Sequence, residues 1–165
     1  AAMRRAVPVV VVDVGACLED DDELLAQQWP WRRHQAARAA IRTSDAVVAT
    51  VACDPASIRH AVDAGDDLCT LVDASRVVVL VNKVEARRSA AVAALELERR
   101  CGWCGGSLLA PLDAAASVAA WGGKALAEVA PASPLRLCVR ELARDLVVRF
   151  GSERRRRRGT VIARA

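Results

Sequence analysis

The chain has 165 residues, enough for one domain with a sizeable core, and its 53% hydrophobic and 27% charged residues are typical of a globular protein. The net charge is +4, but five of the positive charges form one arginine run. The net charge therefore does not indicate that the rest of the chain binds nucleic acid. No stretch is apolar over the roughly 18 residues that a membrane-spanning helix needs.

The first predicted strand covers residues 7–14, a continuous β-branched run typical of a strand buried on both faces of a parallel sheet. Arg4 and Arg5 before it give a superficial likeness to a signal peptide, but Asp13 interrupts the apolar run, so we reject that interpretation. Gly15 ends the strand. The acidic residues 19–23 then predict a solvated loop, and a helix is expected over residues 34–42.

The middle of the chain predicts two strands and two helices. A strand is expected at residues 45–52, and Asp54-Pro55 follows it at once. Since Asp is favoured as an N-cap and Pro at the first helical position, a helix should run from there to about Val72. Residues 76–82 predict a third buried strand, and the Ala-rich residues 85–100 predict a helix.

The last part of the chain predicts a strand at residues 107–111, a short helix at 114–120 and a break at WGGK, residues 121–124. A final helix is expected at about residues 134–150, with apolar residues near helical spacing on one face: Leu135, Val139, Leu142, Leu146 and Phe150. Residues 151–165 are expected to be a basic, disordered tail, so that residues 1–150 form the domain.

Strands and helices therefore alternate, which indicates an α/β fold with a mostly parallel sheet flanked by helices. In such sheets, ligands bind beyond the carboxyl ends of the strands. The predicted strand ends carry four polar residues: Asp13, Asp54, Asn82 and Asp113. The sequence thus predicts a ligand site at this edge of the sheet.

Five segments, taken in order, resemble the MinD/ParA family of P-loop ATPases: VVVVDVG, SDAVVATVACDPASI, VVVLVNKV, LLAPLD and GKALAEVAPASPLRLCVRELARDL. The likeness covers residues 7–149. It is strongest to the actinobacterial septum-site-determining group, which is similar to the ATPases of Flp (Tad) pilus assembly. The resemblance implies a partial P-loop NTPase fold of the SIMIBI type and a role in septum-site determination, cell division, or positioning of a pilus or secretion machine.

The resemblance also implies roles for individual residues. Asp13 matches the Walker B aspartate, which helps to hold Mg²⁺ through its water shell, as suits an ion that keeps several waters. Gly15 matches the glycine of the second switch, whose N–H senses the γ-phosphate. Asn82 matches an asparagine whose amide pairs with the adenine edge, and Leu112 and Asp113 match a loop that packs against the base. ATP and Mg²⁺ are the implied ligands, and the intact protein would be a cytoplasmic homodimer.

One part of the family pattern is missing from this sequence. The phosphate-binding loop, similar to K-G-G-x-G-K-[ST], lies well upstream of the Walker B strand in the family, whereas only six residues precede that strand here. WGGK is no substitute, because it lacks the first glycine and follows a helix rather than a strand. We expect a segment of a longer ATPase, inactive by itself, in preference to a degenerate family member.

A missing strand is the structural consequence that we expect. In the family, the strand that leads into the phosphate loop lies between the Walker B strand and the strand matching residues 46–52. Residues 9–12 and 47–51 are therefore expected to lie about 10 Å apart, roughly two strand spacings. Direct pairing of the two would contradict both this gap and the interpretation as a segment. A gap would leave unpaired ladder groups, and hence poor stability or self-association.

Other features have simpler interpretations. Cys101 and Cys104 have C-x-x-C spacing but no second pair of ligands nearby, so packing is expected rather than zinc or redox chemistry. His34 and His60 are expected to be structural or surface residues.

The arginine run is expected to be solvated. The alternatives are that it binds an anionic membrane, at the inner face, or nucleic acid. The run consists of Arg154, Arg155, Arg156, Arg157 and Arg158. A non-catalytic protein- or membrane-interaction module with this fold is the alternative function.

Overall fold

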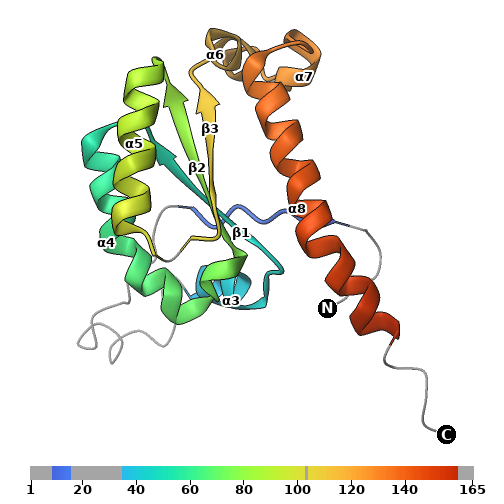
Figure 1. Cartoon of the computed structure of the whole chain (residues 1–165). Helices are drawn as coiled ribbons and strands as arrows, with labels where there is room; N and C mark the ends of the chain where they lie inside the picture. The colour runs from blue at the N-terminus through green and yellow to red at the C-terminus, as the bar shows by residue number, and fades with distance from the viewer. Residues whose placement is uncertain (1–8, 16–34, 103, 160–165) are drawn as a thin grey trace, which may run out of the picture.

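The computed structural model of the chain describes residues 9–15, 35–102 and 104–159. Three strands, β1 (Val47–Ala52), β2 (Val77–Val84) and β3 (Ser107–Pro111), form one parallel sheet in the order β1-β2-β3. Helices cover both faces of this sheet (Figure 1). The predicted α/β class with a parallel sheet is confirmed, and these strands lie close to their predicted positions.

The central strand β2 is buried on both faces. Val77, Val79 and Val81 belong to one apolar cluster, whereas Val78 and Leu80 belong to a second. Alternate side chains of a strand point to opposite faces, so the two clusters lie on opposite sides of the sheet. A continuous run of valines and leucine is what this doubly covered position requires.

The first face is covered by α3 (Gln35–Thr43), α4 (Pro55–Leu71) and α5 (Arg87–Arg100). A short 3-10 turn, η1 (Ala74–Arg76), leads into β2. Helix α4 begins as predicted, because the Asp54 carboxylate accepts the N–H of Ser57 at 2.9 Å and Pro55 occupies the first turn. Since α4 and α5 connect neighbouring parallel strands, both lie on the same face (Figure 1).

The second face is covered by α8 (Pro134–Gly159), which buries Leu142 against β2 and β3. Helices α6 (Ala114–Trp121) and α7 (Leu126–Val129) connect β3 to α8. The predicted end of the last helix at residue 150 is too early. Residues 151–158 include no proline and are mostly arginine, a good helix former, so the backbone stays helical as far as Gly159.

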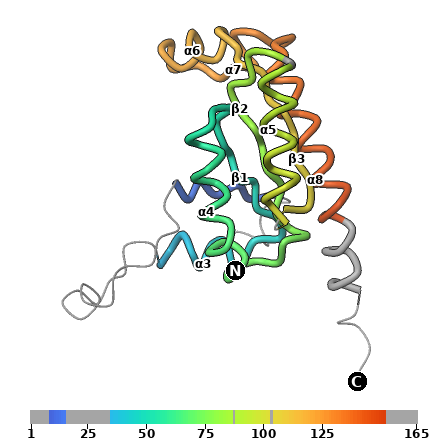
Figure 2. The backbone as a smooth tube through the Cα atoms, turned by 60° about the vertical axis from the view of Figure 1, so that its left-hand side comes forward, coloured from blue at the N-terminus to red at the C-terminus, as the bar shows by residue number. Residues whose placement is uncertain are grey.

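The strand predicted at residues 7–14 is wrong for the part that the structure describes. Residues 9–15 have no strand conformation, and Figures 1 and 2 show them running across the sheet rather than along β1. Val11 is 91% exposed, and only Val14 packs against the core. A β-branched run becomes a strand only when another strand takes up its hydrogen bonds, and no described strand does so here.

The outer edge of β1 is consequently open within the described ranges, since β2 is the one strand that pairs with it. Residues 9–12 do not pair with it directly. The direct pairing that would have contradicted the expected gap is therefore not observed, and β1 is an edge strand of the described sheet.

Candidate functional site

Three of the predicted polar residues lie at one edge of the sheet. All three strands run parallel, so the residues that follow or end them gather beyond their carboxyl ends. Asp54 follows β1, Asn82 lies near the end of β2, and Asp113 follows β3 by two positions. The structure brings these three to the edge where the sequence predicted a ligand site.

The connections that follow β2 and β3 lead to opposite faces of the sheet. The chain leaving β2 enters α5 on the first face, whereas the chain leaving β3 passes through α6 and α7 to α8 on the second face. Adjacent strands that diverge in this way create a crevice between their ends, where open α/β sheets bind ligands. The carboxyl ends of β2 and β3 are therefore the topological switch point of this sheet.

Asn82 and Lys83 occupy this switch point as an irregularity in β2. The pairing with β3 is regular up to Val81 and resumes only at Val84, which lies opposite Pro111. Lys83 has a positive φ of 59°, which is uncommon for a residue with a side chain and often marks a functional position. The Asn82 carboxamide oxygen accepts the N–H of Lys83 at 2.8 Å. No described residue accepts a hydrogen bond from its NH₂ group.

Leu112 and Asp113 directly follow β3 at the same end of the sheet and have different surroundings. The N–H of Leu112 donates to the carbonyl of Val84 at 2.9 Å, and the Leu112 side chain is exposed. The Asp113 carboxylate accepts the N–H of Ala115 at the start of α6 and the hydroxyl of Ser133. The Ser133 hydroxyl, followed by the backbone N–H groups, lowers the pKa of Asp113 below its ordinary value. The Asp113 carboxylate thus stabilises the starts of α6 and α8, a role that the sequence did not indicate.

Asp54 is likewise a helix cap. The backbone N–H and hydroxyl of Ser57 lower the pKa of this carboxyl, and the positive charge of Lys83 adds a smaller effect. That charge effect indicates that Lys83 lies near Asp54 across the ends of β1 and β2. The left-handed conformation of Lys83 was not predicted, because a lysine gives no sequence signal for a positive φ.

Asp13 and Gly15 are not at the end of a strand. The Asp13 carboxylate accepts the N–H of Gly15 at 3.0 Å, and Gly15 has a φ of 73°, so the two residues form a local turn. Across residues 9–15, 35–102 and 104–159, no group of three or more His, Cys, Asp or Glu could hold a metal ion. The acidic residues 19–23, interpreted as a loop, and His34 lie outside the described residues, whereas His60 is exposed on α4.

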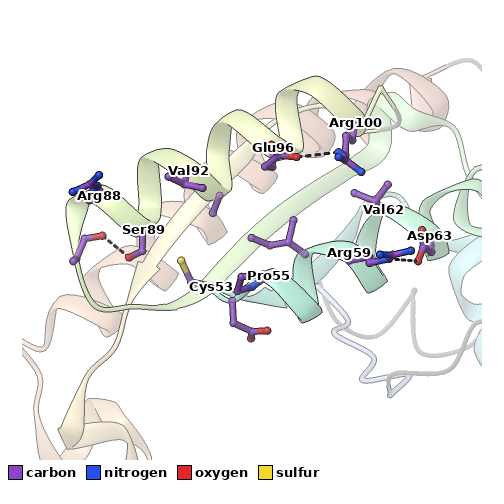
Figure 3. A pocket seen from close by; sticks show the side chains of 14 residues that line it. Cys53, Pro55, Arg59, Val62, Asp63, Arg88, Ser89, Val92, Glu96 and Arg100 are labelled. Atoms are coloured by element: carbon purple, nitrogen blue, oxygen red, sulfur yellow. Dashed lines mark hydrogen bonds and ion pairs between the residues drawn. The ribbon is translucent and has the colours of Figure 1, made fainter.

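A groove of about 860 Å³ lies between α4 and α5 on the first face of the sheet (Figure 3). Val62 and Val92 lie along its walls, and Cys53 lies near one end. Two ion pairs, each within one helix, lie along it: Arg59 with Asp63 at 3.9 Å and Arg100 with Glu96 at 2.9 Å. Of the predicted residues beyond the strand ends, Asp54 lines this groove, whereas Asn82, Leu112 and Asp113 do not.

Cys101 belongs to the core cluster of the first face, and Cys104 packs against it. Burial, followed by the neighbouring Cys104, raises the pKa of the Cys101 thiol to about 11, which keeps it protonated. The Cys104 thiol donates a weak hydrogen bond to the Cys101 carbonyl at 3.6 Å. This geometry supports the expected packing role.

Comparison with protein-family models gives no match for this chain, and comparison with curated proteins gives none either. Within the part of the chain that the structure describes, no helix is both long and apolar enough to cross a membrane.

Proposed function

We propose that this chain binds an adenine nucleotide through its base, at the crevice between the carboxyl ends of β2 and β3, as part of a MinD/ParA-like ATPase. The observation that carries this proposal is the position of Asn82. Its NH₂ group has no acceptor among the described residues, and it lies at the topological switch point beside the exposed Leu112.

The chemistry of Asn82 suits this ligand. A carboxamide has a donor and an acceptor side by side, which matches the amino group and neighbouring ring nitrogen of adenine. Its oxygen has two lone pairs, so it can keep the Lys83 N–H while it accepts from the base. Leu112 would supply apolar contact to the ring, as the apolar lining of ligand sites generally does.

Phosphate binding is a separate requirement, which we do not assign to this chain. A glycine-rich loop that opens a helix supplies several N–H groups to phosphates, and no such loop is present in the sequence. We therefore propose base recognition with low affinity and no ATP turnover by this chain alone. The ATP–Mg²⁺ complex, Asp13 and Gly15 as its partners, homodimerisation, and the positioning of a septum or of a pilus or secretion machine are proposed on the sequence resemblance.

An NMR titration of the isotope-labelled chain tests base binding. We expect adenosine to shift the amide signals of residues 82–84 and 112–113, guanosine to shift them less, and tripolyphosphate to leave them unchanged. The Asn82→Ala variant should raise the adenosine dissociation constant by about tenfold, the value of one good hydrogen bond. Ser107→Ala, at the opposite end of β3, is the matched control. Equal affinity in Asn82→Ala, or shifts confined to the α4–α5 groove, would contradict the proposal.

A second candidate function is binding of an anionic surface through α8. The specific observation is that this helix continues as far as Gly159 and so includes the arginine run at residues 154–158. Arginine clusters bind phosphates of membranes or nucleic acids. Truncation after Gly151 should then abolish binding to anionic vesicles or DNA at low salt while leaving the melting temperature nearly unchanged, because the apolar contacts of α8 with the sheet precede that point.

A further inference from the structure

Two strand-forming segments lack a strand partner among the described residues, and both lie on the surface. One is the outer edge of β1, and the other is the valine-rich run at residues 9–14. Each has six residues. The unpaired edge can accept a further strand, and the unpaired β-branched run can supply one.

The edge of β1 is ready to accept a strand. The N–H of Cys53 donates to the carbonyl of Asn82 at 2.8 Å, so alternate residues from Cys53 backwards direct their backbone groups toward β2. The residues between them, Val48 and Thr50, direct theirs outward, and their side chains are also exposed. The sequence of β1, VVATVA, has no charge or proline to protect this edge.

The run at residues 9–14 matches this edge in chemistry. Val9, Val10, Val11 and Val12 are all exposed, and Val12 is 60% exposed. Valine favours strands because its branched side chain packs well on a pleated surface. The four successive exposed valines are therefore suited to pair with a strand, but no described strand pairs with them.

The run does not fill the edge of its own chain. Residues 9–15 lie across the strand direction in both views of the backbone (Figures 1 and 2). Val14 packs against the core cluster on the α4 side, and the turn between Asp13 and Gly15 fixes the end of the run. The run is therefore held across the strand direction in its own chain, and among the described residues no strand pairs with the outer edge of β1.

We propose that two copies of this chain exchange their valine runs, so that residues 9–14 of each copy add a strand to the outer edge of β1 in the other. The exchange is reciprocal, and a two-fold axis relates the two pairings. Backbone hydrogen bonds from Val48 and Thr50 stabilise the dimer, and the exposed valines are removed from water.

Sedimentation velocity of the full chain and of paired lysine variants tests this exchange. Val12→Lys places a charge in the donated run, and Thr50→Lys places one on the accepting edge. Each should raise the dimer dissociation constant by about tenfold or more, because charged residues on edge strands oppose pairing. The controls are Val92→Lys, at a valine with a similar exposure of 58%, and Thr70→Lys, at an exposed threonine of α4. Both should dimerise as the unmodified chain does.

Mixing the two disrupted variants decides the geometry. A Val12→Lys copy keeps an intact β1 edge and a Thr50→Lys copy keeps an intact run, so a mixture restores one of the two pairings and should recover part of the dimer. Hydrogen exchange should also show protection of residues 9–14 only at concentrations where the dimer forms. A monomeric unmodified chain, equal effects of the control variants, or no recovery on mixing would each overturn the proposal.

Discussion

The carboxylate of Asp113 accepts a hydrogen bond of 2.5 Å from the hydroxyl of Ser133, twenty residues further along the chain. Asp113 is the N-cap of α6, and the carbonyl of Ser133 accepts the N–H of Leu137 in the first turn of α8. One short hydrogen bond therefore joins the starts of two helices. It also fixes the segment that follows β3 at the switch point.

Removal of this bond should lower stability. Ser133 is buried, and Ser133→Ala leaves the Asp113 carboxylate without its strongest partner. We expect the free energy of unfolding in urea to fall, because a hydrogen bond to a charged group stabilises a fold more than one between neutral groups. Ser107→Ala, at an exposed position at the start of β3, should change it little.

The same bond makes stability depend on pH. The pKa of Asp113 lies below its ordinary value of 3.8, so this carboxylate stabilises the fold when it is ionised. The stabilisation is fully present above the pKa of the unfolded carboxyl and is lost as the pH falls through the lower folded pKa. The urea midpoint of Asp113→Asn should therefore decline less between pH 5 and pH 2 than that of the unmodified chain. An equal decline would show that Asp113 contributes nothing to acid sensitivity.

Gly105 lies where no side chain fits. A Cβ atom there would lie 2.9 Å from the carbonyl oxygen of Ser75 and 3.3 Å from that of Val77. Gly105→Ala should lower the unfolding free energy by about 1–3 kcal/mol, because backbone must shift to admit the methyl group. Gly102→Ala is the matched control, since a Cβ there meets nothing within 4 Å. Comparable losses at both positions would contradict a steric cause, because Gly→Ala without a clash lowers the entropy of the unfolded chain and should not destabilise the fold.

Two leucines of α5 differ in burial, because one lies on the side that faces the sheet and the other on the exposed side. Leu97 is 1% exposed and belongs to the core cluster on the first face, whereas Leu95 is 53% exposed. Thermal or urea unfolding should show a loss of about 2–5 kcal/mol for Leu97→Ala. The loss for Leu95→Ala should stay within about 0.5 kcal/mol, as at most surface positions.

Cys101 should resist alkylation in the folded protein. With a pKa of about 11, only about one thiol in a thousand is ionised at pH 8, and the thiolate is the reactive form. Mass spectrometry after iodoacetamide treatment should find Cys69, which is exposed, modified well before Cys101. Denaturant should remove the difference. Rapid modification of Cys101 in the native state would contradict its assignment as a packing residue.

The candidate site was only partly predictable from sequence. Asn82 and Asp113 were placed at one edge because parallel strands direct their carboxyl ends the same way. The left-handed conformation of Lys83 was not predicted, and neither was the partnership of Asp113 with Ser133. Each involves a segment that is distant in the chain. Lys83 lies where the pairing of β2 with β3 is irregular, and the Asp113 carboxylate bonds to Ser133 at the start of α8.

The sequence by itself determined the elements whose signals are local. Alternation of strands and helices specified a parallel α/β sheet, and the Asp54-Pro55 pair specified where α4 begins. Tertiary structure alone decided the conformation of residues 9–12, which have the composition of a buried strand and yet lie exposed across the sheet. The physical reason is that a helix satisfies its backbone hydrogen bonds within itself, whereas a strand needs a neighbour, and composition cannot say whether that neighbour is present.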